Sequence, residues 1–286
     1  MVQQMRAKFA VTGSGRKGSF PGQPSQLLHI NRPTAQESEE CREDERSIEA
    51  HINEMSTEML KVHPDLNSLK ERMRQTYAYR KTFMATAKTE EIIEKFPALK
   101  LPKILLWEMK EQFLVEADRR MVTELDRMAT KMVQRASMCD LKDCCQRAIN
   151  ACLDDSVRRG LIRDAAILLL PSIFREDSSF LYTLLEEPSV PTPAIMLHNT
   201  HEGNPLQAQR ITLYLDGIQV LTEDSSMDIS YAMSALMSLY FVFAVQYPKE
   251  LRKTLFFIER FVLGIKDHSV VPISVKRLYN CVGSGE

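Results

Sequence analysis

The stretch ISYAMSALMSLYFVFAVQY, residues 229–247, decides how the rest of the sequence is interpreted. It contains no charged residue and approaches the length of about 20 apolar residues that a membrane-spanning helix requires. Ser230, Ser234 and Ser238 recur every fourth residue, and small residues at this spacing let another helix approach closely. The stretch is therefore either a membrane anchor or the central buried helix of a globular domain.

The segment before this stretch, RITLYLDGIQVLTE at residues 210–223, is typical of a β-hairpin. Asp216-Gly217 between two alternating apolar runs favours a two-residue type I′ turn. The expected cross-strand pairs are Leu215 with Ile218, Leu213 with Val220 and Ile211 with Thr222, which places Ile211, Leu213, Leu215, Ile218 and Val220 on one face. An isolated hairpin is only marginally stable, so we expect this face to pack against helices.

The segment after the stretch favours the globular interpretation. KELRKTLFFIERFVLGI, residues 249–265, places one apolar stripe beside a strongly charged face and follows directly on Tyr247-Pro248. A charged amphipathic helix that folds back on an apolar helix closes a globular core. We therefore predict a helical hairpin over residues 228–265 and no membrane span.

The N-terminal half predicts a tail followed by helices. Residues 1–44 are rich in Gly, Ser, Pro and Gln and are expected to be disordered; the GSGRKG motif at 13–18 is followed by prolines, which excludes the helix a dinucleotide site needs. Residues 45–138 predict a helical region, with one helix over 66–86 and one long Met-rich amphipathic helix over 104–136.

Residues 139–286 predict a compact α+β unit. Helices are expected over 140–153 and 156–170, the second of which ends at Pro171, followed by a short helix at 177–187 and a strand at 194–199. The predicted fold class is α+β and predominantly α-helical, with helices packed on a small antiparallel hairpin sheet and a C-terminal helical hairpin.

Several motifs of this half resemble a known family. Leu170-Pro171 with Glu176-Asp177 six residues on, the hairpin that ends in Val220-Leu221, and YPKEL between the last two helices occur in this order, and residues 69–100 match an upstream block. Residues 45–265 thereby resemble the C-terminal region of fish proteins labelled sterile alpha motif domain-containing protein 3-like. The resemblance implies an intracellular protein and supplies no catalytic residue. No segment is expected to form the sterile alpha motif domain itself.

The sequence carries no recognisable catalytic, cofactor or metal motif. Phosphate-binding, serine-hydrolase, zinc-protease and kinase signatures are absent. Four of the six cysteines lie within residues 139–152 without a CxxC pair, which is typical of thiols in a reducing compartment. His198 and His201 lack the partners of a metal site. We predict no enzyme activity, no cofactor and no metal.

Two functions stay open. The amphipathic helices predict a helical scaffold or protein-interaction module that binds a protein partner or itself, in the cytoplasm or the nucleus. The alternative is nucleic-acid binding by a basic and aromatic stripe of Lys70, Arg74, Tyr77 and Lys81, because such residues can bind phosphates and stack on bases. The net charge of −1 means that any such binding must be local rather than driven by a global field.

Overall fold

The computed structural model describes residues 44–200, 203–224, 227–266 and 269–283. The predicted disordered tail and the GSGRKG motif lie outside the described residues. The secondary-structure elements, in chain order, are α2 (Glu45–Met59), α3 (Leu66–Gln75), α4 (Tyr77–Thr86), α5 (Thr89–Lys95), η2 (Pro97–Lys100), α6 (Pro102–Phe113), α7 (Ala117–Arg135), α8 (Asp140–Ala151), α9 (Asp155–Phe174), η3 (Ser178–Phe180), β1 (Tyr182–Thr183), β2 (Ala194–His198), η5 (Pro205–Gln207), β3 (Arg210–Leu215), β4 (Ile218–Asp224), α10 (Ile229–Val242), η6 (Lys249–Leu251), α11 (Arg252–Phe257), the π-helical turn η7 (Ile258–Val262) and α12 (Ile273–Val282).

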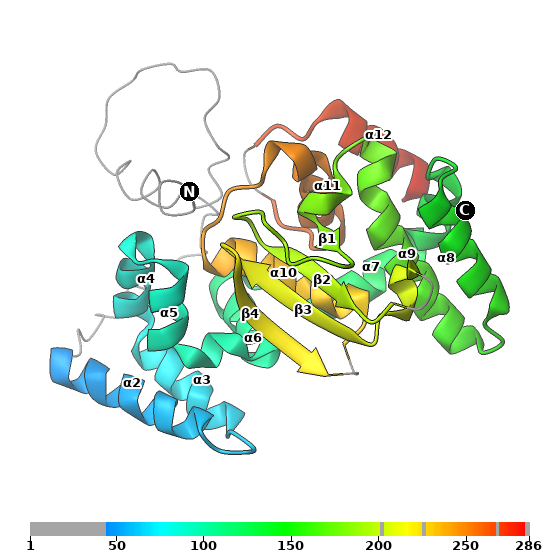
Figure 1. The fold of residues 1–286 in the computed structure, drawn as a ribbon. Helices are drawn as coiled ribbons and strands as arrows, with labels where there is room; N and C mark the ends of the chain where they lie inside the picture. Colours follow the sequence, from blue (N-terminus) through cyan, green and yellow to red (C-terminus); the bar gives the residue numbers. More distant parts are fainter. Residues whose placement is uncertain (1–43, 201–202, 225–226, 267–268, 284–286) are drawn as a thin grey trace.

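The chain forms a predominantly helical α+β fold, as predicted. Helices α2 to α5 gather at one end of the molecule, α8 and α12 lie at the other, and the sheet stands in front of α10 (Figure 1). Helix α10 contacts α6, α7 and α9 on one side and strands β2 and β3 on the other. Most buried apolar residues of these elements belong to one hydrophobic cluster, which does not include Ala194, Met196 and Tyr214 of the sheet. The proposed division at residue 138 stays a prediction.

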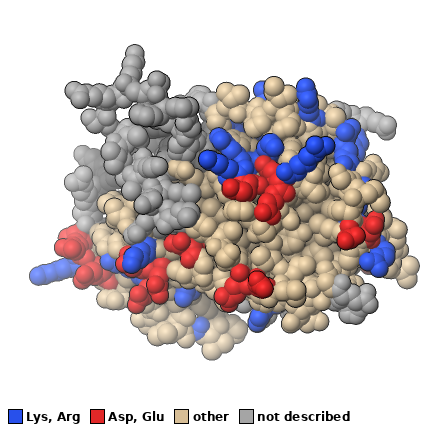
Figure 2. Space-filling model, turned by 45° about the horizontal axis from the view of Figure 1, so that its top comes forward, with Lys and Arg blue, Asp and Glu red and all other residues tan. Residues whose placement is uncertain are grey.

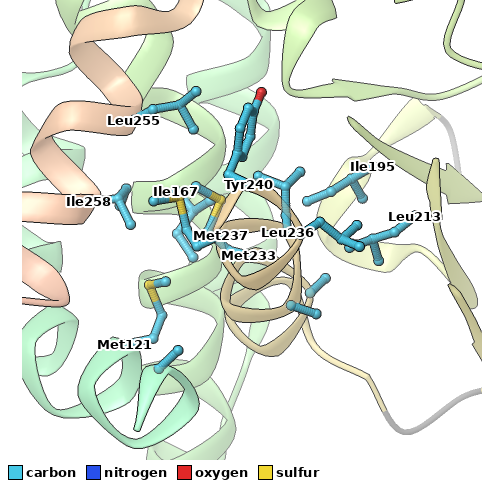
Figure 3. Packing of buried hydrophobic residues seen from close by; sticks show 14 of the residues in the cluster. Met121, Ile167, Ile195, Leu213, Met233, Leu236, Met237, Tyr240, Leu255 and Ile258 are labelled. Carbon is cyan, nitrogen blue, oxygen red and sulfur yellow. The ribbon is translucent and has the colours of Figure 1, made fainter. Parts of the chain in front are cut away.

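Helix α10 forms the centre of this cluster, which answers the question raised by its sequence. Every residue of α10 except Tyr231 is buried. Figure 3 shows Met233, Leu236, Met237 and Tyr240 of α10 between strand residues such as Leu213 and the surrounding helices. No helix among the described residues combines the length and apolarity needed to cross a membrane.

The serines of α10 mark a close helix approach, as predicted. The Ser234 and Ser238 hydroxyls donate to the backbone carbonyls of Ser230 and Ser234, each at 2.9 Å, which satisfies them inside an apolar helix. Ser234 also lies 3.4 Å from the Ala117 carbonyl at the start of α7. A larger side chain at position 234 would push α7 away.

Helix α10 is shorter than the uncharged stretch that suggested it. It ends at Val242 rather than Tyr247, because Ala244 adopts a left-handed conformation with φ 50°. The Val245 N–H then donates to the Tyr240 carbonyl at 2.9 Å, a pattern that ends helices in the Schellman manner. The chain turns here and returns through η6 into α11 and η7, which confirms the helical hairpin.

The sheet has four strands in the order β1-β2-β3-β4 and is mixed rather than purely antiparallel. Strand β1 pairs with β2 in parallel, whereas β2–β3 and β3–β4 are antiparallel. Asp216 and Gly217 have φ of 60° and 73°, which confirms the predicted type I′ turn. The residues predicted to form a short helix at 177–187 instead form η3 and β1, so that prediction was wrong.

A β-bulge changes the predicted hairpin register. Leu215 pairs with Ile218 as predicted, but a register shift between Leu213 and Tyr214 makes Leu213 pair with Leu221 rather than Val220. One extra residue on a bulged strand moves all later pairs by one position. As a consequence Val220 and Leu221 are both buried, a pattern that strict alternation does not predict.

Three helix predictions also need correction. The helix predicted over 104–136 is two helices, α6 and α7, because Leu114 takes a left-handed conformation with φ 57° and ends α6. The helix predicted over 66–86 is divided into α3 and α4 at Thr76. Pro171 lies inside α9 rather than ending it, since the last turn of the helix continues to Phe174 and the left-handed Arg175 closes it.

Two family motifs meet in space at the end of α9. The Glu176 carboxylate accepts the backbone N–H groups of Lys253 and Thr254 at 2.7 and 2.9 Å, and so caps the N-terminus of α11. The Asp177 N–H donates to the Glu250 carbonyl at 3.1 Å. We name these contacts the α9–α11 clasp; the Asp177–Glu250 bond joins the Glu176-Asp177 motif to YPKEL, and Glu176 contacts the residues just after it.

Candidate functional site: a groove along helix α6

The four residues of the predicted stripe do not form one continuous helical stripe. Lys70 and Arg74 lie on α3, whereas Tyr77 and Lys81 follow the break on α4. The break lies at Thr76, whose hydroxyl donates to the Arg72 carbonyl at 2.8 Å. The chain therefore changes direction in the middle of the predicted stripe.

Part of the charge of the stripe is neutralised within the protein. The Arg74 guanidinium lies 3.4 Å from carboxylate oxygens of both Glu71 and Glu111 and stacks over the Trp107 ring at 5.2 Å. The Lys81 ammonium lies 6.0 Å from the Tyr77 ring centroid. Arg74 and Tyr77 share a surface depression with Trp107, and Lys70 shares a second one with the same tryptophan. Lys81 lines neither depression.

Beneath these residues lies a buried ion pair that the sequence analysis missed. The Arg80 Nη1 donates to the Glu108 carboxylate at 2.7 Å, and its Nη2 donates to the Met73 carbonyl at 2.9 Å. Gln112 donates to the same Glu108 oxygen at 2.6 Å, and both charged side chains are 2% exposed. A buried pair with several hydrogen bonds holds neighbouring elements in one geometry. The pair thereby locks α4 to α6.

Three surface depressions lie around the exposed face of α6, and we name them together the α6 groove. Their volumes are about 180, 450 and 560 Å³. Trp107 lines the first and second, Lys110 the second and third, and Glu111 the first and third, so the three depressions are neighbours on the surface. Helix α6 and its C-cap contribute most of this lining: Lys103, Leu106, Trp107, Glu108, Lys110, Glu111, Gln112 and Leu114.

Leu114 is the most unusual residue of the groove. It adopts φ 57° and ψ 31°, and its side chain stands 71% exposed where helices commonly place glycine. The left-handed conformation costs a bulky residue about 1–2 kcal/mol. Because it is exposed and its backbone is strained, this side chain adds little to the stability of the chain.

The charges of the α6 groove are mixed, with an excess of basic residues in its central depression. Four basic side chains (Lys70, Lys103, Lys110 and Arg119) and two acidic ones line that depression with Trp107 and Tyr231. Glu116 pairs with Lys110 at 2.6 Å and with Arg119 at 3.4 Å. Within the described part of the chain, Lys70 and Lys103 form no ion pair. Figure 2 shows similarly interspersed charge over one face of the molecule rather than a field of one sign.

Two buried acids lie outside the α6 groove. Burial raises the pKa of Asp164 to about 7, with a smaller contribution from Asp228. The Asp164 carboxylate accepts the Ser230 N–H at 2.9 Å and so supports the start of α10. Burial also raises the pKa of Glu259, within η7, to about 7, and burial foremost raises the pKa of Tyr247 beside it. These groups belong to the core rather than to an accessible site.

Within the described residues, the histidines and cysteines singled out in the sequence lie apart from the α6 groove. His198 hydrogen-bonds to Thr212 at 2.9 Å and lies 3.3 Å from an Arg210 nitrogen, and burial foremost lowers its pKa; His201 lies outside the described residues. No three His, Cys, Asp or Glu side chains of the described chain converge as a metal site would require. Burial raises the pKa of the Cys145 thiol to about 12, which makes it a poor nucleophile.

Comparisons with known proteins agree with the resemblance seen in the sequence. The chain is similar to Sterile alpha motif domain-containing protein 3 of Homo sapiens, with 25% identity over 241 residues that cover 82% of this chain and 44% of that protein. The protein of the same name from Mus musculus is 23% identical over 251 residues, 84% of this chain and 47% of its own. The chain thus spans less than half the length of these curated relatives. No family model matches the sequence, and no solved structure matches it.

Proposed function

We propose that the chain is a non-enzymatic protein-interaction module that recognises its partner through the α6 groove. The single observation that carries the proposal is Leu114, a strained and exposed apolar residue at the end of a groove with a charged rim. Hot spots of protein interfaces are enriched in Trp, Tyr and Arg and are surrounded by less important contacts. Trp107 provides such an anchor, and Leu114 adds apolar surface in the adjoining depression.

The cysteines support an intracellular location for the module, cytoplasmic or nuclear. Each of the five cysteines that the structure describes is a free thiol. Free thiols are typical of reducing compartments, where disulfides rarely persist.

Proximity labelling combined with light scattering tests the proposed function. The protein fused to a labelling enzyme is expected to mark a reproducible set of neighbours in cells, or light scattering of the purified protein is expected to show a defined oligomer. A monomer with no reproducible neighbour above a fusion of the labelling enzyme alone would contradict the proposal.

Nucleic-acid binding remains the second candidate, because Lys70, Arg74 and Tyr77 stand around Trp107 in the groove. This function predicts micromolar affinity for single-stranded oligonucleotides that falls steeply with salt. Replacing Lys70, Arg74 and Lys81 by Glu should abolish that binding in fluorescence anisotropy. Absence of binding at 20–50 mM salt, roughly the range in which electrostatic binding is strongest, would exclude it.

A further inference from the structure

The charges of the α6 groove specify the chemistry of its partner. Its central depression contains two lysines, Lys70 and Lys103, that have no ion pair among the described residues, whereas Lys110 and Arg119 share Glu116. An interface buries charge favourably only when the partner supplies the opposite sign. The unpaired groups that a partner can satisfy in this depression are therefore mainly cationic.

Apolar surface lies next to these lysines. Trp107 lines the same depression, and Leu114 lines the adjoining one. The acids Glu111, Glu116 and Asp118 alternate with the basic residues along the groove. A polyanion such as single-stranded nucleic acid would bring phosphates close to these carboxylates, which repel them. A peptide can instead place a carboxylate beside the lysines and an apolar side chain against the apolar surface.

We infer that the α6 groove binds an acidic peptide segment of a partner protein, whose Asp or Glu side chains contact Lys70 and Lys103 and whose apolar residues pack against Trp107 in the central depression and Leu114 in the adjoining one. The inference rests on the proposed function and adds the class of ligand. The excess of basic residues in the central depression is the reason for inferring an acidic segment. The exposed Leu114 is the reason for inferring an apolar contact.

Peptide display on the full chain tests the inference directly. The probe is a phage library of random 16-residue peptides, selected on the wild-type protein and then measured as synthetic peptides by fluorescence anisotropy. The enriched peptides are expected to combine a net negative charge with a shared apolar position. Lys70→Glu/Lys103→Glu is expected to weaken their binding about 30-fold, because two favourable ion pairs become repulsive. The matched control Lys276→Glu/Arg277→Glu makes the same charge change on the exposed face of α12 and should leave binding unchanged.

Leu114→Gly separates recognition from folding. Glycine accepts φ 57° without strain, so the variant should be at least as stable as the wild type, yet binding of the selected peptides should fall about tenfold through loss of the apolar contact. Enriched peptides that are basic, or that bind both double variants equally, would overturn the inference. Stronger binding of a 20-residue deoxythymidine oligonucleotide than of any peptide would also overturn it. If proximity labelling identifies partners but the selected peptides bind the groove variants as well as the wild type, the inference of an acidic peptide ligand is wrong and the proposed interaction function stands.

Discussion

Replacement of Asp164 by Asn should remove a large part of the pH dependence of stability. Asp164 lies 8% exposed at the junction of α9 and α10, where burial foremost raises its pKa from 3.8 to about 7. A carboxyl whose folded pKa lies above its unfolded value binds its proton more tightly in the folded state. It therefore stabilises the protein at acidic pH, and this contribution is lost as the pH rises from about 4 to about 7.

The size of the effect follows from the two pKa values. Between pH 5 and pH 8 the wild type should lose about 3 kcal/mol of unfolding free energy through Asp164 alone. Asn cannot ionise, and its amide oxygen can still accept the Ser230 N–H. The stability of Asp164→Asn relative to the wild type should therefore rise by about 3 kcal/mol over this pH interval.

Urea unfolding measures this difference. Samples at half-unit steps between pH 5 and pH 8 are unfolded and followed by far-UV circular dichroism and by the fluorescence of Trp107, the single tryptophan. Asp155→Asn provides the control, since it neutralises an exposed carboxyl in the first turn of the same helix and should keep the wild-type slope. Parallel pH profiles of wild type and Asp164→Asn would refute the reasoning.

Four further changes test other parts of the structure by the same unfolding assay. Burial raises the pKa of Glu259 to about 7, so the wild type should lose stability between pH 5 and pH 8 as this carboxyl ionises, and Glu259→Gln should not show that loss. A pH profile equal to that of the wild type would contradict the raised pKa. Glu108→Ala should destabilise the protein by about 3–5 kcal/mol, since it leaves the buried Arg80 charge unpaired; a loss below 1 kcal/mol would count against the pair. Glu176→Ala should cost about 2 kcal/mol by removing two hydrogen bonds at the start of α11, and Glu176→Gln about half as much. Leu114→Gly should raise stability by about 1 kcal/mol by relieving the left-handed strain, and a loss would show that this side chain supports the fold.

The features that could be predicted from the sequence are those that depend on local pattern. The Asp216-Gly217 turn requires two residues of positive φ, and the apolar character of α10 requires burial on every side, so both were predictable. The helix breaks at Thr76 and Leu114 were not, because neither residue is a glycine or proline and each break depends on tertiary contacts. The register shift after Leu213 was not predictable either, because it buries the adjacent residues Val220 and Leu221 where strict alternation predicts one buried and one exposed.

The candidate site shows the same division. Lys70, Arg74 and Tyr77 were recognised as a basic and aromatic group, and they do lie around the groove. Trp107 and Lys103, which also line the groove, lie on α6. The periodicity of a single sequence predicts helices but not which helices pack together, so it could not predict that α3 and α6 are neighbours. Leu114 could have been noticed only through its conformation.

The α9–α11 clasp has a kinetic consequence. It joins Glu176 and Asp177 to residues that follow some 70 positions later, after the whole sheet and α10. Closing a flexible loop of that length costs roughly 4 kcal/mol of chain entropy, about what its few hydrogen bonds contribute. We therefore expect the clasp to form late in folding, after α10 has packed into the core. A contact that forms late should slow unfolding and have little influence on the rate of folding.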